Sequence, residues 1–188
     1  MASVIARKGH VVLIEALAGL REQAWVLHCV GSRTMDPHAA AAARAAAQAH
    51  DLAGRVHWHG VVEGERLREH YAAADLFVLP SLFEGYGMVL AEALAHGLPV
   101  VATDTGNAAR LLSGDVPGDA GGAGIVVPPG NAVALRAALA ALMSEPARRH
   151  ALAAAARAAR SRLPRWDGCC ARWEAVLNAV TTAGPDRR

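Results

Sequence analysis

Residues 76–102 read LFVLPSLFEGYGMVLAEALAHGLPVVA, and this stretch decides the fold. The apolar run Leu76–Leu79 predicts a buried strand, and a polar loop with glycines leads from it into a helical pattern over Met88–His96. A glycine and a proline directly after that pattern end the helix, since glycine tolerates a left-handed conformation and proline cannot continue a helix. A second apolar run, Val100–Ala102, completes a strand–helix–strand unit of the kind that builds a parallel sheet.

The same alternation covers the rest of the chain and predicts an α/β fold. We expect a Rossmann-like, doubly wound parallel sheet of six strands with helices on both faces, in the strand order 3-2-1-4-5-6. The expected strands are Ser3–Ala6, Trp25–Val30, Val56–Trp58, Leu76–Leu79, Val100–Ala102 and Gly124–Val127. The expected helices are His10–Leu20, His38–Ala49, Glu65–Ala73, Met88–His96, Ala108–Leu112 and Ala132–Met143, with extra C-terminal helices near Arg148–Arg162 and Asp167–Val180.

Composition limits the class of protein. With 188 residues, 53% of them hydrophobic, the chain is long enough for one domain over 1–188 with its own core. Its 19 basic and 17 acidic residues nearly cancel, which argues against nucleic acid as a partner. The N-terminus lacks the pattern of a secretory signal, and polar residues interrupt every apolar run before it reaches the length of a membrane span. The few, irregularly spaced cysteines suit reduced thiols, so we expect a cytoplasmic protein with no integral membrane segment.

The loop before Met88 is suited to an anion. Gly85 and Gly87 leave the backbone unobstructed where the N–H groups of a helix N-terminus point outward, so that a diphosphate could approach closely. Glycines are also common in turns that bind nothing, and the loop alone is weak evidence.

Glu92 strengthens the case for a ligand. Apolar residues flank it on both sides and leave its helix no polar face, so we expect its carboxylate to be buried. Burial of a carboxylate is costly unless it is paired or hydrogen-bonded. The partner is then either the hydroxyl groups of a ligand or, as the alternative, a cation of this chain.

Lys8 supplies the other half of the predicted site. It lies in Arg7-Lys8-Gly9-His10, which follows the first predicted strand. In the expected strand order the loops after strands 1 and 4 face each other across the crevice at the topological switch point. We therefore expect the Lys8 loop and the Glu84 loop to offer a cation, free amides and two carboxylates to a phosphate-linked sugar.

These residues resemble the group 1, or family 4, retaining glycosyltransferases of the GT-B fold, in the C-terminal domain that binds the donor. Glu84 and Glu92 match the E-x7-E motif of that family. The further matches are Pro80-Ser81, the Glu84–Gly87 sequence EGYG, Ala91-Glu92-Ala93, Gly97–Ala102 and Val126–Gly130. The resemblance extends from Arg7 to the last helix. It implies a nucleotide-diphospho-sugar binding domain of an enzyme that moves a hexose-type sugar to an acceptor which the sequence does not identify.

The resemblance also implies roles for individual residues. Lys8 would contact the donor diphosphate, Glu84 the sugar hydroxyls and Glu92 the ribose hydroxyls, so that Lys8 and Glu84 are the expected catalytic residues. The other expected donor-binding residues are Arg7, Gly31, Ser32, His59, Gly60, Val61, Ser81, Gly85, Tyr86, Gly87, Met88 and Val89. Residues 85–88 would line the sugar and phosphates with backbone amides, and residues 59–61 would flank the nucleobase. The donor would be UDP- or GDP-linked, with no cofactor and no metal, because Lys8, helix dipoles and amides would balance the diphosphate charge.

Two features depart from the family pattern. Many relatives have Gly-Arg in the first strand, with the arginine as a second cation, whereas Ala2 and Ser3 stand here and Arg7 is the candidate replacement. The acceptor-binding N-terminal domain of a GT-B enzyme is also not found in this sequence. We therefore expect donor binding without efficient transfer, and a terminal helix, 165–183, that packs toward that other domain. The full-length enzyme could lie peripherally on a membrane.

Other readings of the sequence remain open. A Rossmann-like interaction or assembly module without catalytic activity is the main alternative, and apolar residues of the last helix, among them Trp173 and Leu177, would serve it. A dinucleotide-dependent oxidoreductase is disfavoured because no G-x-G-x-x-G follows the first strand. His57 and His59 alternate on one strand, but the sequence places no third ligand beside them, and we predict no metal.

Overall fold

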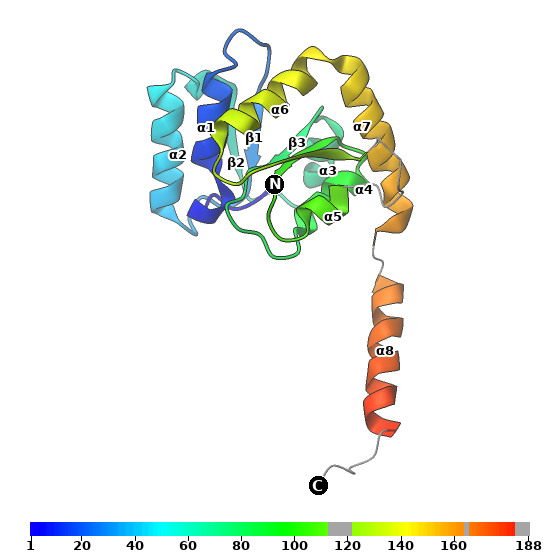
Figure 1. Cartoon of the computed structure of the whole chain (residues 1–188). Coiled ribbons are helices and arrows are strands. Elements are labelled where there is room, and N and C mark those ends of the chain that lie inside the picture. Colours follow the sequence, from blue (N-terminus) through cyan, green and yellow to red (C-terminus); the bar gives the residue numbers. More distant parts are fainter. Residues whose placement is uncertain (113–121, 164–165, 183–188) are drawn as a thin grey trace.

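The structure, a computed structural model that describes residues 1–112, 122–163 and 166–182, confirms the predicted α/β class (Figure 1). The strands are β1 (Leu27–Val30), β2 (Val56–Gly60), β3 (Phe77–Leu79), β4 (Val100–Thr103) and β5 (Gly124–Val127). The helices are α1 (His10–Ala18), α2 (Pro37–Ala49), α3 (Gly64–Ala72), α4 (Met88–Ala95), α5 (Ala108–Leu112), α6 (Ala132–Ser144), α7 (Pro146–Ala159) and α8 (Trp166–Thr182). Short 3-10 turns lie at Ala6–Lys8, Ala53–Arg55 and Arg160–Arg162.

All strand pairs are parallel, as the alternation of strands and helices predicts. β1 pairs with β2, with Leu27 opposite Val56 and His28 opposite His57. β4 lies between β3 and β5. Parallel pairing places the carboxyl ends of neighbouring strands at one edge, where the connecting loops gather.

The predicted first strand, Ser3–Ala6, is wrong, and the described residues form five strands in two sheets. Residues 2–4 do run beside β1, since the Ala2 N–H donates to the Val30 carbonyl at 2.8 Å and the Val4 N–H to the Ser32 carbonyl at 2.7 Å. The chain then turns into the 3-10 turn at Ala6–Lys8 before a ladder forms with β3. A cavity of about 660 Å³ is lined by residues at the amino-terminal ends of β1 and β3, among them Leu27 and Phe77.

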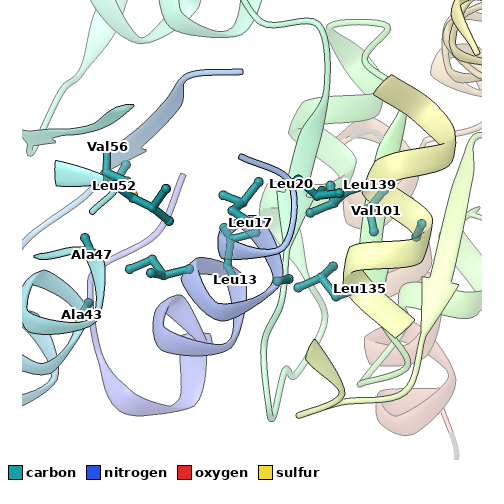
Figure 2. Close-up of a cluster of buried hydrophobic side chains, with 14 of the residues drawn as sticks. Leu13, Leu17, Leu20, Ala43, Ala47, Leu52, Val56, Val101, Leu135 and Leu139 are labelled. Atoms are coloured by element: carbon teal, nitrogen blue, oxygen red, sulfur yellow. The ribbon is translucent and has the colours of Figure 1, made fainter. Parts of the chain in front are cut away.

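Two hydrophobic clusters occupy the two faces of the sheets. Figure 2 shows the first, in which Leu13, Leu17 and Leu20 of the α1 segment lie between the α2 and α6 sides. Alanines of α2, including the fully buried Ala43, let that Ala-rich helix approach closely. The second cluster joins α3, α4, α5 and α7. Within β4, Val101 belongs to the first cluster and its neighbours to the second, as the two-residue period of a strand requires.

The last helix lies apart from these layers. Figure 1 shows α8 extending away from the sheets, and its side chains Trp173, Val176, Leu177 and Val180 are between 54% and 70% exposed. The terminal helix predicted at 165–183 forms over Trp166–Thr182, and residues 165 and 183 lie outside the described ranges. Its packing toward another domain stays a prediction. In the described part of the chain, the helices fall short of the length and apolar character that a membrane span needs.

Candidate functional site

The two predicted loops meet at the carboxyl edge of the sheets. The Leu82 N–H, after β3, donates to the Arg7 carbonyl at 2.7 Å. Gly9 has a positive φ of 66°, and a Cβ there would lie 1.9 Å from the Pro80 carbonyl oxygen. Only glycine allows this approach of the two backbones. The loops after residues 2–4 and after β3 therefore form one surface, as the strand order predicts.

A buried charge cluster lies where these loops touch. Lys8 Nζ is 2.6 Å from Glu84 Oε2 and 3.0 Å from Oε1, and both side chains are about nine-tenths buried. Arg7 Nη1 lies 3.3 Å from Glu84 Oε1, with its side chain 48% exposed, and the Ser81 hydroxyl donates to Oε2 at 3.3 Å. Two cations surround one carboxylate, so the cluster carries one net positive charge.

The pKa of Glu84 follows from this environment. Burial acts to raise it, but hydrogen bonds and charge from Lys8, and then from Arg7, outweigh burial and lower the pKa below its ordinary value. Glu84 is therefore ionised at neutral pH. An ionised, buried carboxylate with two cations is a preformed polar site at the sheet edge.

Two residues at and after the carboxyl end of β4 support the cluster, and the sequence patterns did not indicate either of them. The Thr103 hydroxyl donates to the Ser81 carbonyl, and Gly106, with φ 58°, leaves no room for a Cβ, which would lie 2.1 Å from the Gly85 carbonyl oxygen. The carboxyl ends of all parallel strands share an edge. The same rule that selected Lys8 and Glu84 therefore gives the signal that would have found Thr103 and Gly106.

The glycine loop leads into α4 with its backbone open. Gly87, with φ 77°, is the N-cap of α4, and no side chain caps the helix. A Cβ at Gly85 would meet nothing within 4 Å, while Tyr86 and Met88 are 48% and 69% exposed, and Val89 is half-buried. The first N–H groups of α4 are thus accessible to an anion.

The expected burial of Glu92 is wrong, because its side chain is exposed. α4 buries Leu90, Ala93 and Leu94, whereas its other alanines are small enough to lie near solvent. The apolar composition of this helix therefore did not predict which of its faces is buried. The buried Tyr71 of α3 donates its hydroxyl to Glu92 Oε2 at 2.8 Å. Burial, and then this carboxylate, raise the pKa of Tyr71, so the phenol keeps its proton and orients Glu92.

The remaining predicted residues lie at or just after the carboxyl ends of β1 and β2. The Gly31 N–H donates to the Gly60 carbonyl at 2.7 Å, which joins these two loops, and Val61 is 66% exposed. Ser32 binds residue 4 through its carbonyl. The His59 side chain lies against other histidines, with Nε2 2.9 Å from His28 Nδ1. Within the described residues, no hydrogen bond or ion pair that we find links this group to Glu84, and its role at a nucleobase stays a prediction.

Comparison with known proteins identifies the family and the relatives of this chain. Residues 1–145 match the family described as glycosyl transferases group 1. The chain is 36% identical over 180 residues to the D-inositol 3-phosphate glycosyltransferase of Xylanimonas cellulosilytica, covering 96% of this chain and 41% of that protein. It is 37% identical over 139 residues to the protein of the same name from Kineococcus radiotolerans, covering 73% of this chain and 31% of that protein. The chain thus spans well under half the length of these relatives.

Solved structures share the fold. Sucrose-phosphate synthase from Thermosynechococcus elongatus superposes with a TM-score of 0.81 at 28% identity, over 97% of this chain and 44% of that one. The Anabaena protein Alr3699/HepE, in complex with UDP-glucose, gives a TM-score of 0.77 at 23% identity, over 95% of this chain and 47% of that one. At that identity the second likeness concerns the fold alone.

Proposed function

The chain belongs to the group 1 glycosyl transferases, and on this premise we propose that it is the donor-binding domain of a retaining hexosyltransferase that takes a nucleotide-diphosphate sugar. The observation that carries the proposal is the cluster of Lys8, Arg7 and Glu84 beside the open N-terminus of α4. It combines net positive charge, accessible amides and a carboxylate at the carboxyl edge of a parallel sheet. That edge is where ligands of such folds bind.

The diphosphate would bind to the cations and the helix terminus. Lys8 Nζ has three N–H donors and directs two contacts at Glu84, which leaves one donor for a phosphate oxygen. Arg7, half-exposed, has a planar fork of donors that suits phosphate. Negative charge that develops on the leaving diphosphate would be stabilised by these groups and by the amides of residues 85–88. No metal is required for this balance.

The two glutamates would bind hydroxyl groups. Glu84 is held by Lys8 at the loop where the transferred sugar would lie, and Glu92 presents an exposed carboxylate to the ribose. Tyr71 acts as a positioning residue, because its hydroxyl fixes one Glu92 oxygen. The loops of Gly31, Ser32 and His59–Val61 would flank the base. The Anabaena neighbour has been solved with UDP and with UDP-glucose, in keeping with a nucleotide-sugar ligand, and we propose a UDP- or GDP-linked donor for this chain.

We further propose that residues 1–188 bind donor without efficient transfer. The described residues supply groups for a donor, and the relatives named above are more than twice as long as the part this chain covers. The acceptor would then be selected by residues of another domain, on which α8 would pack. The complete enzyme would be cytoplasmic, or peripheral to a membrane.

Calorimetric titration tests the donor site. The purified chain is titrated with UDP, GDP and ADP, and with UDP-glucose and GDP-mannose, and the titrations are repeated with Glu92→Ala and Lys8→Ala. We expect one nucleotide to bind and each substitution to weaken it by at least about tenfold, as the loss of a charge-assisted hydrogen bond predicts. Glu22→Gln, an exposed glutamate before β1, is the matched control. Binding of no nucleotide, or binding that both substitutions leave unchanged, would sink the proposal.

The exposed face of α8 favours a second candidate, an interaction module. Its apolar side chains recur at helical spacing and are each more than half exposed: Trp173, Val176, Leu177 and Val180. Light scattering after size-exclusion chromatography separates the two candidates. A monomer that binds nucleotide supports the donor domain, whereas a stable oligomer without nucleotide affinity supports the module.

A further inference from the structure

Three histidines from three elements converge on one surface. His28 belongs to β1, His59 to β2 and His70 to α3. One ring nitrogen of each lies within 4.8 Å of the others, and His28 Nδ1 is 2.9 Å from His59 Nε2. The ring centroids of His59 and His70 are 4.5 Å apart, and those of His28 and His59 are 5.1 Å apart.

The sheet register explains how two of these rings meet. His28 lies opposite His57 in the β1–β2 ladder, and His59 is two residues further along β2. The side chains of His28, His57 and His59 therefore point to the same face of this sheet. That face lies opposite the one that α1 and α2 cover, because Cys29 and Val56, which alternate with these histidines, belong to the α1–α2 cluster. α3 brings His70 to the exposed side.

We propose that His28, His59 and His70 form a binding site for a divalent transition metal ion such as Zn²⁺ or Ni²⁺. Imidazole is a preferred ligand of these ions, and three protein ligands with a water in the fourth position make a complete tetrahedral shell. Zn–N bonds of about 2.0–2.1 Å place tetrahedral ligand atoms about 3.3 Å apart. One pair of nitrogens, His28 Nδ1 and His59 Nε2, is 2.9 Å apart, and all three lie within 4.8 Å of one another. Metal binding would require the longer distances to shorten, and His28 and His59 are exposed side chains that can rotate to do so.

The environment of the cluster keeps His28 and His59 neutral at pH 7. Burial, and then the neighbouring histidines, lower the pKa of His28 and of His59, and Arg66 contributes at His59. Neutral imidazoles with free lone pairs are the form that binds a metal. A bound ion would also tie α3 to the β1–β2 sheet, so that binding stabilises the fold. The site does not depend on the proposed donor function.

Metal titration of the chain without an affinity tag tests the site. Zn²⁺ and Ni²⁺ are titrated against a chromophoric chelator, and thermal unfolding is followed with and without each ion. We expect one ion per chain and a higher melting temperature with metal. His28→Asn, His59→Asn and His70→Asn should each weaken binding by at least about tenfold, since even indirect partners of a metal site contribute tenfold or more. Each variant alters an exposed or half-buried side chain and keeps the fold.

Two sets of variants make the result decisive. His38→Asn and His150→Asn remove exposed histidines on α2 and α7 and should leave affinity unchanged. Equal losses in these controls would show nonspecific surface binding and overturn the proposal. His57→Asn tests a chelate within β2 through His57 and His59. If His57→Asn lowers affinity while His70→Asn does not, the ion binds that strand pair and the three-element site is wrong. Absence of metal binding by the intact chain would overturn it as well.

Discussion

The two glutamates of the E-x7-E motif differ sharply in environment, although they lie on one loop and the helix that follows it. Glu84 is buried, ionised and held by Lys8, Arg7 and Ser81. Glu92 is exposed and held by the hydroxyl of Tyr71. The difference teaches that position at the sheet edge, rather than the apolar character of the neighbouring sequence, determines which carboxylate is desolvated. Buried ion pairs hold the Glu84 carboxylate in place, whereas the Glu92 carboxylate is exposed to solvent.

Removal of the Lys8 cation should give the largest effect on stability. Lys8→Met leaves Glu84 buried with only the half-exposed Arg7 as a charged neighbour that we find among the described residues. Breaking a buried ion pair costs about 3–5 kcal/mol, so we expect the free energy of unfolding in urea to fall by about 4 kcal/mol. The double variant Lys8→Met/Glu84→Gln should recover most of this loss, because no buried charge remains unpaired. A double variant as unstable as the single one would contradict the charge argument.

Two glycines near Glu84 also differ in environment, since one is tightly packed and the other faces open space. Gly106→Ala must fit a Cβ 2.1 Å from the Gly85 carbonyl oxygen at φ 58°, and we expect a loss of about 3 kcal/mol from overpacking and backbone strain. Gly85→Ala meets open space and should change stability by no more than about 0.5 kcal/mol. Thermal unfolding of both variants measures the contrast. Equal effects would mean that the loop is not clamped as the structure shows.

Acid titration separates the contributions of His10 and Glu84 to stability. Burial lowers the pKa of His10 from 6.5 to about 4, and its Nδ1 is buried without a hydrogen-bond partner that we find in the described residues. Below pH 6.5 the unfolded chain binds a proton that the folded chain does not, so stability falls between pH 6.5 and 4. At about 1.4 kcal/mol for each pKa unit, the loss is at most about 3.5 kcal/mol. His10→Leu should remove most of the loss in this window and leave the smaller part that His28 and His59 contribute, since their pKa values are also lowered, as urea unfolding at several pH values would show.

The Glu84 contribution then appears at lower pH. Its pKa is lowered in the folded state, so its stabilisation is fully present above the ordinary value of 4.5 and is lost as pH falls below it. In the His10→Leu background, Glu84→Gln should therefore flatten the profile below pH 4.5 and leave its shape above pH 4.5 unchanged. If Glu84→Gln instead flattens the profile only above pH 4.5, the loss of stability below pH 4.5 does not come from Glu84.

The sequence predicts the features that strand order determines, and it fails for those that depend on how distant segments pack. The contact of the Lys8 and Glu84 loops was predictable, because parallel strands of known order fix which loops share an edge. The failure at Ser3–Ala6 is local: the apolar run is short, and pairing with β1 alone does not complete a strand. Glu92 was misjudged because alanine is compatible with both surface and core. His70 could not be assigned to His28 and His59, since the register of α3 against the sheet is a tertiary feature.

The smallest expected change in stability belongs to Glu92, and it should accompany a clear change in ligand affinity. Glu92→Gln keeps the shape of an exposed side chain and retains an acceptor for Tyr71, so we expect a stability change within about 0.5 kcal/mol. Nucleotide affinity should fall by about tenfold, because a neutral amide accepts hydroxyl hydrogen bonds less strongly than a carboxylate. Tyr71→Phe should lower affinity less, since the charge remains and only its orientation is lost. Calorimetry on the three proteins, with unfolding measured in parallel, checks this order. If Glu92→Gln costs stability but not affinity, Glu92 contributes to the fold rather than to donor binding, and the proposed contrast between the two glutamates is wrong.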